Sequence, residues 1–487
     1  MSASDDILHE IRETALPQQT CLDKRVRERL TGLTERLLGA HPDAGQEFDY
    51  YLGIRERGIP VPEAAVAAAV AGATVVVTGG SGCVGTALMS ALAGLAPGRL
   101  TSLSITPPAR RVPGVRYQWL DVRSREDVVE YFRRHRPDLV FHLAAQRDPG
   151  LAEQQVTRTA CTNVLGTHHV MGAAEQAGVP RVVYASTGKA MRPYTSDVYA
   201  SSKRVGEWVA ARAAARGTTA CSAARFTHVV DNSIILDRLL RWCRERAPVR
   251  LHCPETLFYA QSALESAQLL LVAATAPDDG VCRLHTIRDL GWPVHLLGLA
   301  LGVMRSAGTV APLYVAGHDP GYEERPYPGL YDPALAGDVS PLLNALEATQ
   351  VQSAASPAVD AVPAPAVEVP RLQACLSELA QVNGRHTDTA VRQVLDDGAY
   401  ALLQATARAA PAAVVNRIAR LAQPYRASMP AEHLRIDDVF RRECAERAGR
   451  RPGGVRPVSV DGHGRVRGRR VSTSTSDSPG RSQRSLS

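Results

Sequence analysis

The stretch VVVTGGSGCVGTAL, residues 75–88, decides the fold of this 487-residue chain. Its first four residues are apolar or β-branched and predict a short buried strand, whereas its last residues predict the start of a helix. The turn between the two elements contains Gly79, Gly82, Cys83, Val84 and Gly85. Glycines let the backbone approach a pyrophosphate, which the positive end of the following helix attracts. Because a strand precedes this turn and a helix follows it, we expect a dinucleotide to bind there.

Short apolar strands alternate with helices from this turn onward. The further expected strands are RLTSLSI (99–105), VRYQWLD (115–121), DLVFHLAA (138–145) and RVVYAST (181–187). The helices between them are expected in TALMSALAGL (86–95), REDVVEYFRRHRP (125–137) and TNVLGTHHVMGAAEQAG (162–178). This alternation predicts an α/β, Rossmann-type fold with a doubly wound parallel sheet. After about residue 225 the pattern becomes irregular, with one further strand expected at VRLH (249–252), and we expect a small substrate-binding lobe there.

Composition changes along the chain predict five regions. They are a helical N-terminal segment (1–70), the α/β core with its lobe (71–350), a Pro/Ala linker (351–369), a helical C-terminal segment (370–447) and a basic tail (448–487). The tail is rich in Gly, Arg and Ser, so we expect it to be disordered. The sequence leaves open whether the two helical segments pack on the core or bind a partner.

Charge and cysteine usage exclude several classes of protein. The net charge is +7, but residues 441–487 alone carry twelve arginines against four acidic residues, so the remainder is nearly neutral and we expect no specific nucleic-acid binding. Nine cysteines occur singly, without the paired spacing of a zinc site or a disulfide framework, and we expect no metal. The longest apolar run, residues 64–77, is too short to cross a bilayer, and we see no signal peptide. We therefore expect a cytoplasmic protein without membrane insertion.

Lysine is rare in this chain, and its placement is informative. Only Lys24, Lys189 and Lys203 occur, although arginine is abundant. Lys203 follows Tyr199 by four residues, so on a helix the two side chains share a face. An ammonium beside a phenol lowers the pKa of the phenol, which makes tyrosine a usable base. The same spacing also occurs by chance in many helices, so its context must decide.

Residues near the ends of the other strands suggest how the dinucleotide is held. The second strand ends in SLSITPPARR, without the acidic residue that usually binds an NAD ribose. Arg110 and Arg111 would neutralise a 2′-phosphate, which favours NADP over NAD, although two solvated arginines are an equal alternative. Further expected contacts to the dinucleotide are Asp121, placed against the adenine, and Val122, Ala144 and Ala145.

These motifs together resemble a known family. TGGSGCVG, WLDVR, FHLAAQRDPGLAE, NVLGTHHVMGAAEQAGVPRVVYASTGKA and the Tyr199–Lys203 pair are similar to the extended short-chain dehydrogenase/reductases. The closest likeness is to the CapD-type polysaccharide-biosynthesis branch, which contains nucleotide-sugar 4,6-dehydratases and epimerases. It covers residues 72–330, including a degraded motif at 316–324. The resemblance implies an NAD or NADP cofactor and a sugar-nucleotide substrate.

The resemblance also implies roles for individual residues. Tyr199 would deprotonate a sugar hydroxyl during oxidation at C4, and Lys203 would hold the nicotinamide ribose and lower the pKa of Tyr199. Ser186 and Thr187 would hydrogen-bond the reacting hydroxyl, and Asn163 would support this geometry and contribute to cofactor binding. The oxidised sugar has an acidic C5 proton, which makes elimination or epimerisation possible. Enzymes of this class dimerise through a four-helix bundle, so a homodimer through the helix at 198–216 is expected.

The chain departs from the family pattern on the substrate side. Gly188 replaces the aspartate that protonates the departing hydroxyl in the dehydratases, while Lys189 remains, and Asp197 is a candidate substitute acid. His228 replaces an amide, and Leu257 and Asp319 stand where two phosphate-binding cations are expected, which puts a UDP-sugar in doubt. Epimerisation, dehydration and simple oxidation therefore stay open. The alternative is a catalytically altered Rossmann scaffold that binds dinucleotide and a protein partner.

Overall fold

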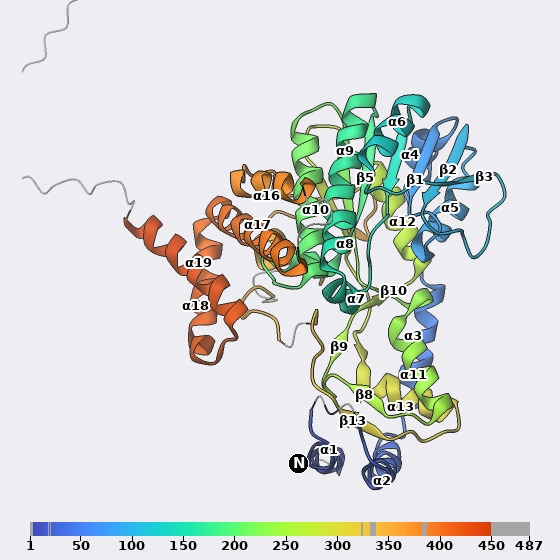
Figure 1. Cartoon of the computed structure of the whole chain (residues 1–487), viewed down its shortest axis with the longest axis vertical. Coiled ribbons are helices and arrows are strands. Elements are labelled where there is room, and N and C mark those ends of the chain that lie inside the picture. Colours follow the sequence, from blue (N-terminus) through green and yellow to red (C-terminus); the bar gives the residue numbers. More distant parts are fainter. Residues whose placement is uncertain are drawn as a thin grey trace, which may run out of the picture.

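The computed structural model describes residues 3–17, 19, 21–322, 325–331, 338–381 and 387–449. Its centre is a nine-stranded sheet in the order β14-β15-β11-β6-β5-β4-β1-β2-β3 (Figure 1). The strands are β1 (Thr74–Thr78), β2 (Arg99–Ser104), β3 (Val115–Trp119), β4 (Leu139–His142), β5 (Arg181–Thr187), β6 (Ala220–Phe226), β11 (Arg283–Ile287), β14 (Gln352–Ser353) and β15 (Val359–Pro363). Strands β1 to β6 and β11 pair in parallel, which confirms the doubly wound α/β fold.

The order of the strands reverses between β1 and β4. Strand β1 pairs with β2 on one side and with β4 on the other, so the chain departs from the centre of the sheet in both directions. Ligands of such sheets bind in the crevice at the carboxyl ends of the strands beside this reversal. The glycine-rich turn directly follows β1 and therefore lies in this crevice.

Helices cover both faces of the sheet. One face packs against α4 (Glu63–Val70), α5 (Cys83–Ala93) and α12 (Ala263–Ala274). The other face packs against α6 (Arg125–His135), α9 (Gly166–Ala177) and α10 (Val198–Ala215). The central strands are buried on both sides, as their continuous runs of valine and alanine predict.

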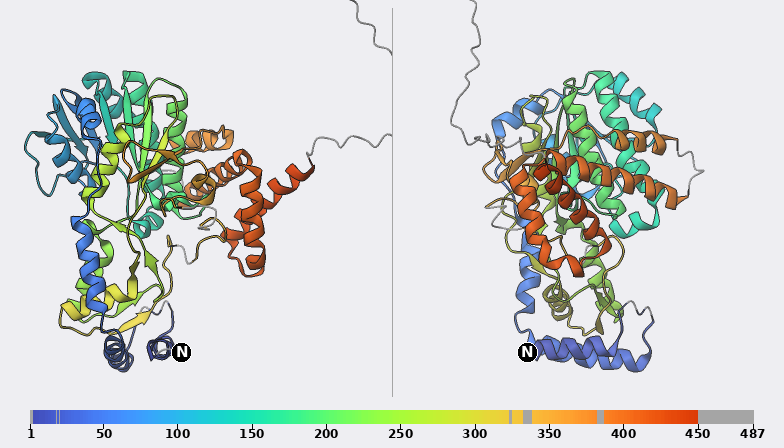
Figure 2. Two further views of the ribbon diagram at one scale, coloured as in Figure 1. Left: turned by 180° about the vertical axis from the view of Figure 1, so that it is seen from behind. Right: turned by 90° about the vertical axis from the view of Figure 1, so that its left-hand side faces the viewer.

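The N-terminal segment is not a separate unit, because its helices complete the lobe. Helices α1 (Ala3–Thr14), α2 (Lys24–Ala40) and α3 (Ala44–Gly53) share one hydrophobic core with α11 (Ile234–Glu245) and α13 (Leu296–Ser306). Strands β8 (Val249–Leu251) and β13 (Leu313–Val315) belong to the same core; β8 occupies most of the strand expected at 249–252. The α1–α2 pair closes the far end of this lobe (Figure 2).

The expected Pro/Ala linker contains sheet structure instead. Strand β15 lies within it and pairs antiparallel with β11. Its Val359, Ala361 and Val362 are buried, and Asp360 receives hydrogen bonds from Arg288 and from the backbone of residue 340. The linker-like composition of this region did not indicate a strand of five residues. The frequencies of alanine and proline do not show which side chains are buried against a neighbouring strand.

The C-terminal segment is helical as expected and packs beside the core. It consists of α16 (Pro370–Ala380), α17 (Asp388–Ala409), α18 (Ala412–Ala422) and α19 (Ala431–Gly449). Helix α17 lies against α10, and α18 and α19 stand away from the sheet (Figure 2). Helix α10, expected to enter a bundle with a second subunit, is thus covered by its own chain. The basic tail beyond residue 449 lies outside the described residues. In the described ranges, no helix is both long and apolar enough to cross a membrane.

Candidate active site

One cavity of about 1370 Å³ lies between the carboxyl edge of the sheet and the lobe. The side chains and backbone that line it come from both parts of the chain. The expected site residues that line it are Gly79, Gly82, Cys83, Val84, Gly85, Ala145, Ser186, Thr187, Gly188, Lys189, Tyr199, Lys203 and His228. The fold therefore brings residues separated by about 150 positions in the sequence to one chamber.

The glycine-rich turn has the shape that a pyrophosphate site needs. Gly79 has a φ of +73°, and a Cβ added to it would lie 2.7 Å from the backbone nitrogen of Ala144. A Cβ on Gly85 would lie 2.5 Å from the carbonyl oxygen of Gly79. Helix α5 begins at Cys83, so its unpaired N–H groups face the cavity edge. Burial raises the pKa of Cys83 to about 11, so this thiol stays protonated.

Four expected dinucleotide contacts do not line the cavity. The Asp121 carboxylate is paired with Arg123 at 2.5 Å, and Val122 packs against Gly166. The other two are Ala144, which lies over the turn, and Asn163. Asn163 binds both backbone groups of Gln146 and donates to Ser202 on α10, so it ties the β4 loop to that helix.

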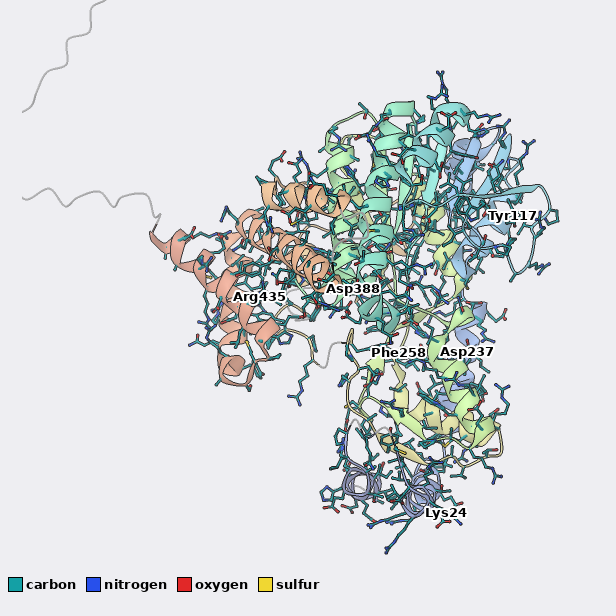
Figure 3. All side chains as sticks on the ribbon, viewed as in Figure 1. Lys24, Tyr117, Asp237, Phe258, Asp388 and Arg435 are labelled. Atoms are coloured by element: carbon teal, nitrogen blue, oxygen red, sulfur yellow. The ribbon has the colours of Figure 1, made fainter. Side chains whose placement is uncertain are left out.

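The two arginines expected at a 2′-phosphate lie on the exposed loop before β3. Arg110 and Arg111 are both exposed, and neither lines the cavity. The Arg111 guanidinium lies over the ring of Tyr117, 5.3 Å from its centroid. Figure 3 shows Tyr117 at the edge of the sheet. This stacking gives Arg111 a structural contact that the sequence pattern did not indicate.

Tyr199 lies in the first turn of α10, which Asp197 caps. Burial raises the pKa of Tyr199, although a hydrogen bond with Thr187 opposes this shift. Lys203 donates to the carbonyl oxygen of Ala185 at 2.5 Å and lies over the ring of Tyr184 at 4.3 Å. The lowered tyrosine pKa expected from the neighbouring lysine is therefore not found, since burial dominates and Lys203 is directed to β5.

Burial also lowers the pKa of Lys203 to about 7, against the opposing charge of Glu207. The unfolded chain holds this proton up to a pH near 10, so wild-type stability rises with pH from about 7 to about 10. We expect Lys203→Met to raise the free energy of unfolding by about 1–3 kcal/mol at pH 6, because it removes a buried ammonium. The gain should shrink towards pH 10. Urea unfolding at several pH values measures it, and a pH-independent difference contradicts the assignment.

Ser186 and Thr187 point to opposite sides of β5, because side chains alternate along a strand. The Thr187 hydroxyl is hydrogen-bonded to Tyr199. Ser186 instead donates to Glu207 at 2.6 Å, inside the protein. Its expected role beside the reacting hydroxyl is therefore not supported by the direction of its side chain.

Glu207 belongs to a buried charge network that the sequence analysis missed. The fully buried Arg225 donates to Glu207 at 2.8 and 2.9 Å and to Glu347 at 2.8 Å through two nitrogens. Arg204 donates to the same Glu347 at 2.9 Å. The network joins α10, β6 and the chain around residue 347. The only signal in the sequence was the placement of charged residues in otherwise apolar elements.

Gly188 stands where the dehydratases carry their acid, and the structure leaves no room for a side chain there. A Cβ on Gly188 would lie 2.8 Å from the side chain of the buried Leu342. The substitute acid, Asp197, caps α10 with one oxygen and receives a hydrogen bond from Arg192 at 3.0 Å with the other. Lys189 remains at the cavity and donates to the carbonyl oxygen of Gly321 at 2.8 Å.

The lobe contributes a polar cluster around His228. The hydroxyl of Tyr51, from α3, is hydrogen-bonded to His228 at 2.9 Å, and Ser233 is hydrogen-bonded to the same nitrogen at 2.8 Å. Burial lowers the pKa of His228 to about 4, so the imidazole is neutral at physiological pH. Sequence reasoning missed Tyr51, because nothing local links the N-terminal helices to this cavity.

The cavity also has positive charge that the sequence analysis did not assign. Five arginines line it, namely Arg147, Arg192, Arg238, Arg241 and Arg250. Among the described residues, neither a hydrogen bond nor an ion pair occupies the guanidinium of Arg147 or Arg238. Arg250 lies 3.8 Å from Asp319, which is also hydrogen-bonded to His252. The described residues contain no cluster that could hold a metal ion.

Comparisons with known proteins agree with this architecture. CapD of Staphylococcus aureus, a capsular polysaccharide biosynthesis protein, is 26% identical over 249 residues, covering 48% of this chain and 41% of CapD. EpsC of Bacillus subtilis, a probable polysaccharide biosynthesis protein, is 25% identical over 211 residues, covering 42% of this chain and 34% of EpsC. The chain thus matches less than half the length of either relative.

A solved structure and a family model extend the comparison. The X-ray structure of Pen from Bacillus thuringiensis has the same fold, with a TM-score of 0.50, 19% identity, and coverage of 61% of this chain and 88% of Pen. The family model described as polysaccharide biosynthesis protein matches residues 75–321, just over half of the chain, from the first strand through the lobe. The chain therefore belongs to the polysaccharide biosynthesis protein family, in its CapD-type branch.

Proposed function

We propose that the protein is an NAD(P)-dependent enzyme that oxidises the C4 hydroxyl of a sugar nucleotide. The observation that carries this proposal is the single cavity that joins the glycine-rich turn, the Thr187–Tyr199 pair and the arginines of the lobe. Gly79 and Gly85 leave no room for a side chain, which fits a pyrophosphate lying on this turn. A bound nicotinamide supplies a hydride acceptor for the sugar carbon.

The chain's own groups supply the proton chemistry. The phenolate form of Tyr199 accepts the proton of the sugar hydroxyl and becomes a neutral phenol, and Thr187 favours the phenolate before the transfer by donating a hydrogen bond to it. Lys203, which donates a hydrogen bond to the Ala185 carbonyl and lines the cavity, would contact the ribose of a dinucleotide lying on the turn. The neutral His228, oriented by Tyr51 and Ser233, offers a polar contact to the sugar.

The site favours epimerisation over dehydration. Eliminating water needs an acid at the departing hydroxyl, and such an acid is worth about 10²–10⁴-fold in rate. Gly188 has no proton to donate, and Asp197 is held by its cap and by Arg192. A 4-epimerase needs no such acid, only the tyrosine, the lysine and a bound dinucleotide that would supply reversible hydride chemistry at C4. Its biosynthetic context would be polysaccharide formation, as the family name suggests.

Arg238 is proposed to bind the diphosphate of the substrate. It lies on α11 facing the cavity. Burial lowers the pKa of His252 and raises the pKa of Tyr322, and the charge of Arg238 acts on both groups across the chamber, in the lowering direction. We expect Arg238→Gln to raise KM for a sugar nucleotide about tenfold, because a charge-assisted hydrogen bond contributes about 1.5–3 kcal/mol. Steady-state kinetics measures this effect. Arg244→Gln, on the exposed side of the same helix, is the control, and an equal effect of both variants would refute the assignment.

The cofactor preference is a separate part of the proposal. Arg110 and Arg111 favour NADP, but neither reaches the cavity and Arg111 is stacked on Tyr117. Titration of the protein with NAD and with NADP decides between them. If NAD binds more tightly than NADP, and if its affinity is unchanged in Arg110→Gln, both arginines lie outside the cofactor site.

The decisive experiment is a mass-spectrometric and absorbance readout of the purified protein with a panel of nucleotide sugars. Bound dinucleotide and an isobaric product establish the epimerase, whereas a product lighter by one water establishes the dehydratase. Accumulation of reduced cofactor indicates a simple oxidoreductase. Bound dinucleotide without turnover on any sugar favours the scaffold. Gly79→Val is the matched control, and wild-type protein that binds no dinucleotide refutes the proposal.

A further inference from the structure

Helix α10, which contains Tyr199 and Lys203, has no open face in the part of the chain that the structure describes. Every residue from Val198 to Ala214 is buried except Tyr199 and Arg212, which are partly exposed. Strands β5 and β6 cover one side of the helix, α9 a second, and α17 a third. Apart from the side of its first turn that lines the cavity, the helix is thus covered on all sides by the same polypeptide.

The cover formed by the C-terminal segment is a continuous hydrophobic core. Val205, Trp208 and Val209 of α10 belong to the same buried cluster as the apolar residues of α16 and α17. The α16 and α17 members of this cluster are Leu372, Cys375, Leu376, Leu379, Val391, Leu395 and Leu402. Gly398 on α17 lets α16 approach, since a Cβ there would lie 2.7 Å from Leu372. Contacts of this kind resemble a domain core rather than a transient surface.

Polar contacts determine how the segment is placed along α10. The indole of Trp208 donates to the carbonyl oxygen of Val367 at 2.9 Å. Asp388, at the start of α17, accepts hydrogen bonds from the backbone and hydroxyl of Thr157 on α8 (Val156–Ala160) at 3.1 and 2.5 Å. Figure 3 shows Asp388 at the end of α17 that lies beside α8.

A second set of contacts reaches the first turn of α10. Arg392 of α17 forms an ion pair with Glu153 at 2.6 Å, and the other oxygen of Glu153 accepts from the backbone of Val198 at 2.8 Å. Further along, Glu432 of α19 accepts from the backbone and hydroxyl of Ser196 at 2.8 and 2.9 Å. The C-terminal helices therefore hold the residues on both sides of the α10 cap.

We propose that α16 and α17 act as an in-chain partner for α10, so that a second copy of the chain does not pack there. In this arrangement all the packing partners of the catalytic helix belong to its own chain. Arg392 is a positioning residue, because it holds Glu153, which in turn binds the first turn of the helix. The segment lies outside residues 75–321, so it is an addition to the part of the chain that matches the family.

Mass measurement and hydrogen exchange of the full chain test the packing. We expect light scattering to give the mass of one chain. If an oligomer forms instead, we expect hydrogen exchange in α10 to be the same at low and at high micromolar protein concentration. A dimer in which exchange across 198–214 slows with concentration would overturn the proposal. Neither readout depends on catalytic activity, so both hold whatever reaction the enzyme performs.

Variants at Arg392 test its positioning role. Arg392→Ala is expected to accelerate exchange in the first turn of α10 roughly fivefold, while β1 and β4 keep their protection. Arg392→Lys should restore most of the protection because it keeps the charge. Thr389→Ala, on the exposed side of α17, is the control. Unchanged exchange in Arg392→Ala, or an acceleration that spreads equally to β1, would refute the role of this contact.

Discussion

Tyr199→Phe is expected to lower turnover by about 10²–10⁴-fold and to leave dinucleotide affinity within about twofold. The phenol is the group in the cavity that can accept the sugar proton beside Thr187, whereas the rest of the ring only packs. Removal of one oxygen leaves the glycine-rich turn and Lys203 intact. Stopped-flow measurement of hydride transfer, together with a fluorescence titration of the dinucleotide, separates the two quantities.

The pH dependence of the wild-type enzyme gives the same prediction a second readout. Burial raises the pKa of Tyr199, so the phenolate that acts as base is scarce at pH 7. We expect the rate of sugar oxidation to increase with pH above neutrality, and Tyr199→Phe to lose this increase. Tyr131→Phe, on α6 outside the cavity, is the matched control. A Tyr199→Phe variant that keeps wild-type turnover would exclude the proposed mechanism and favour the scaffold.

Arg225→Ala is expected to cost about 3–5 kcal/mol of folding free energy, the second large effect. This guanidinium is fully buried and satisfies both Glu207 and Glu347. Its loss leaves two carboxylates inside the protein with only Arg204 beside them. Chemical denaturation measures the loss. The control is Arg216→Ala, which removes an exposed pair with Glu175 and should cost no more than about 1 kcal/mol.

The sign of the pH effect distinguishes a charge network from simple packing. In the wild type, burial raises the pKa of Glu347, but Arg225 and Arg204 outweigh it and the net pKa is lowered. That stability is present above the unfolded pKa and is lost as pH falls through the folded value. In Arg225→Ala the folded pKa should rise above the unfolded one, so the deficit relative to wild type shrinks towards pH 5. A deficit independent of pH would show that lost packing dominates.

The local features of the site could be read from the sequence. The glycines at 79, 82 and 85 and the alternation of strands and helices act over a few residues, so the first βα unit and the sheet follow directly from them. The Tyr199–Lys203 spacing likewise places both side chains on one helix that faces the cavity. These predictions succeeded because backbone sterics and helical periodicity are short-range properties.

Other features depended on contacts between distant segments. The arginines of α11 had no local mark that separates them from solvated surface residues, and the β15 strand was hidden by its composition. The direction of Ser186 became clear only when β6 and α10 placed Glu207 beside it. The pKa of Tyr199 was predicted with the wrong sign, because a sequence records the neighbouring lysine but not the depth of burial.

By itself, the sequence determined a Rossmann-type core of this family, the glycine-rich turn after its first strand and the helix that carries the tyrosine and lysine. The tertiary structure decided that the N-terminal helices complete the lobe, that Tyr51 reaches His228 and that α17 covers α10. Local conformation follows from short-range sterics and periodicity. Burial, ion pairing and the choice of packing partner depend on which distant segments come into contact and exclude water between them. These contacts form only when the whole chain folds.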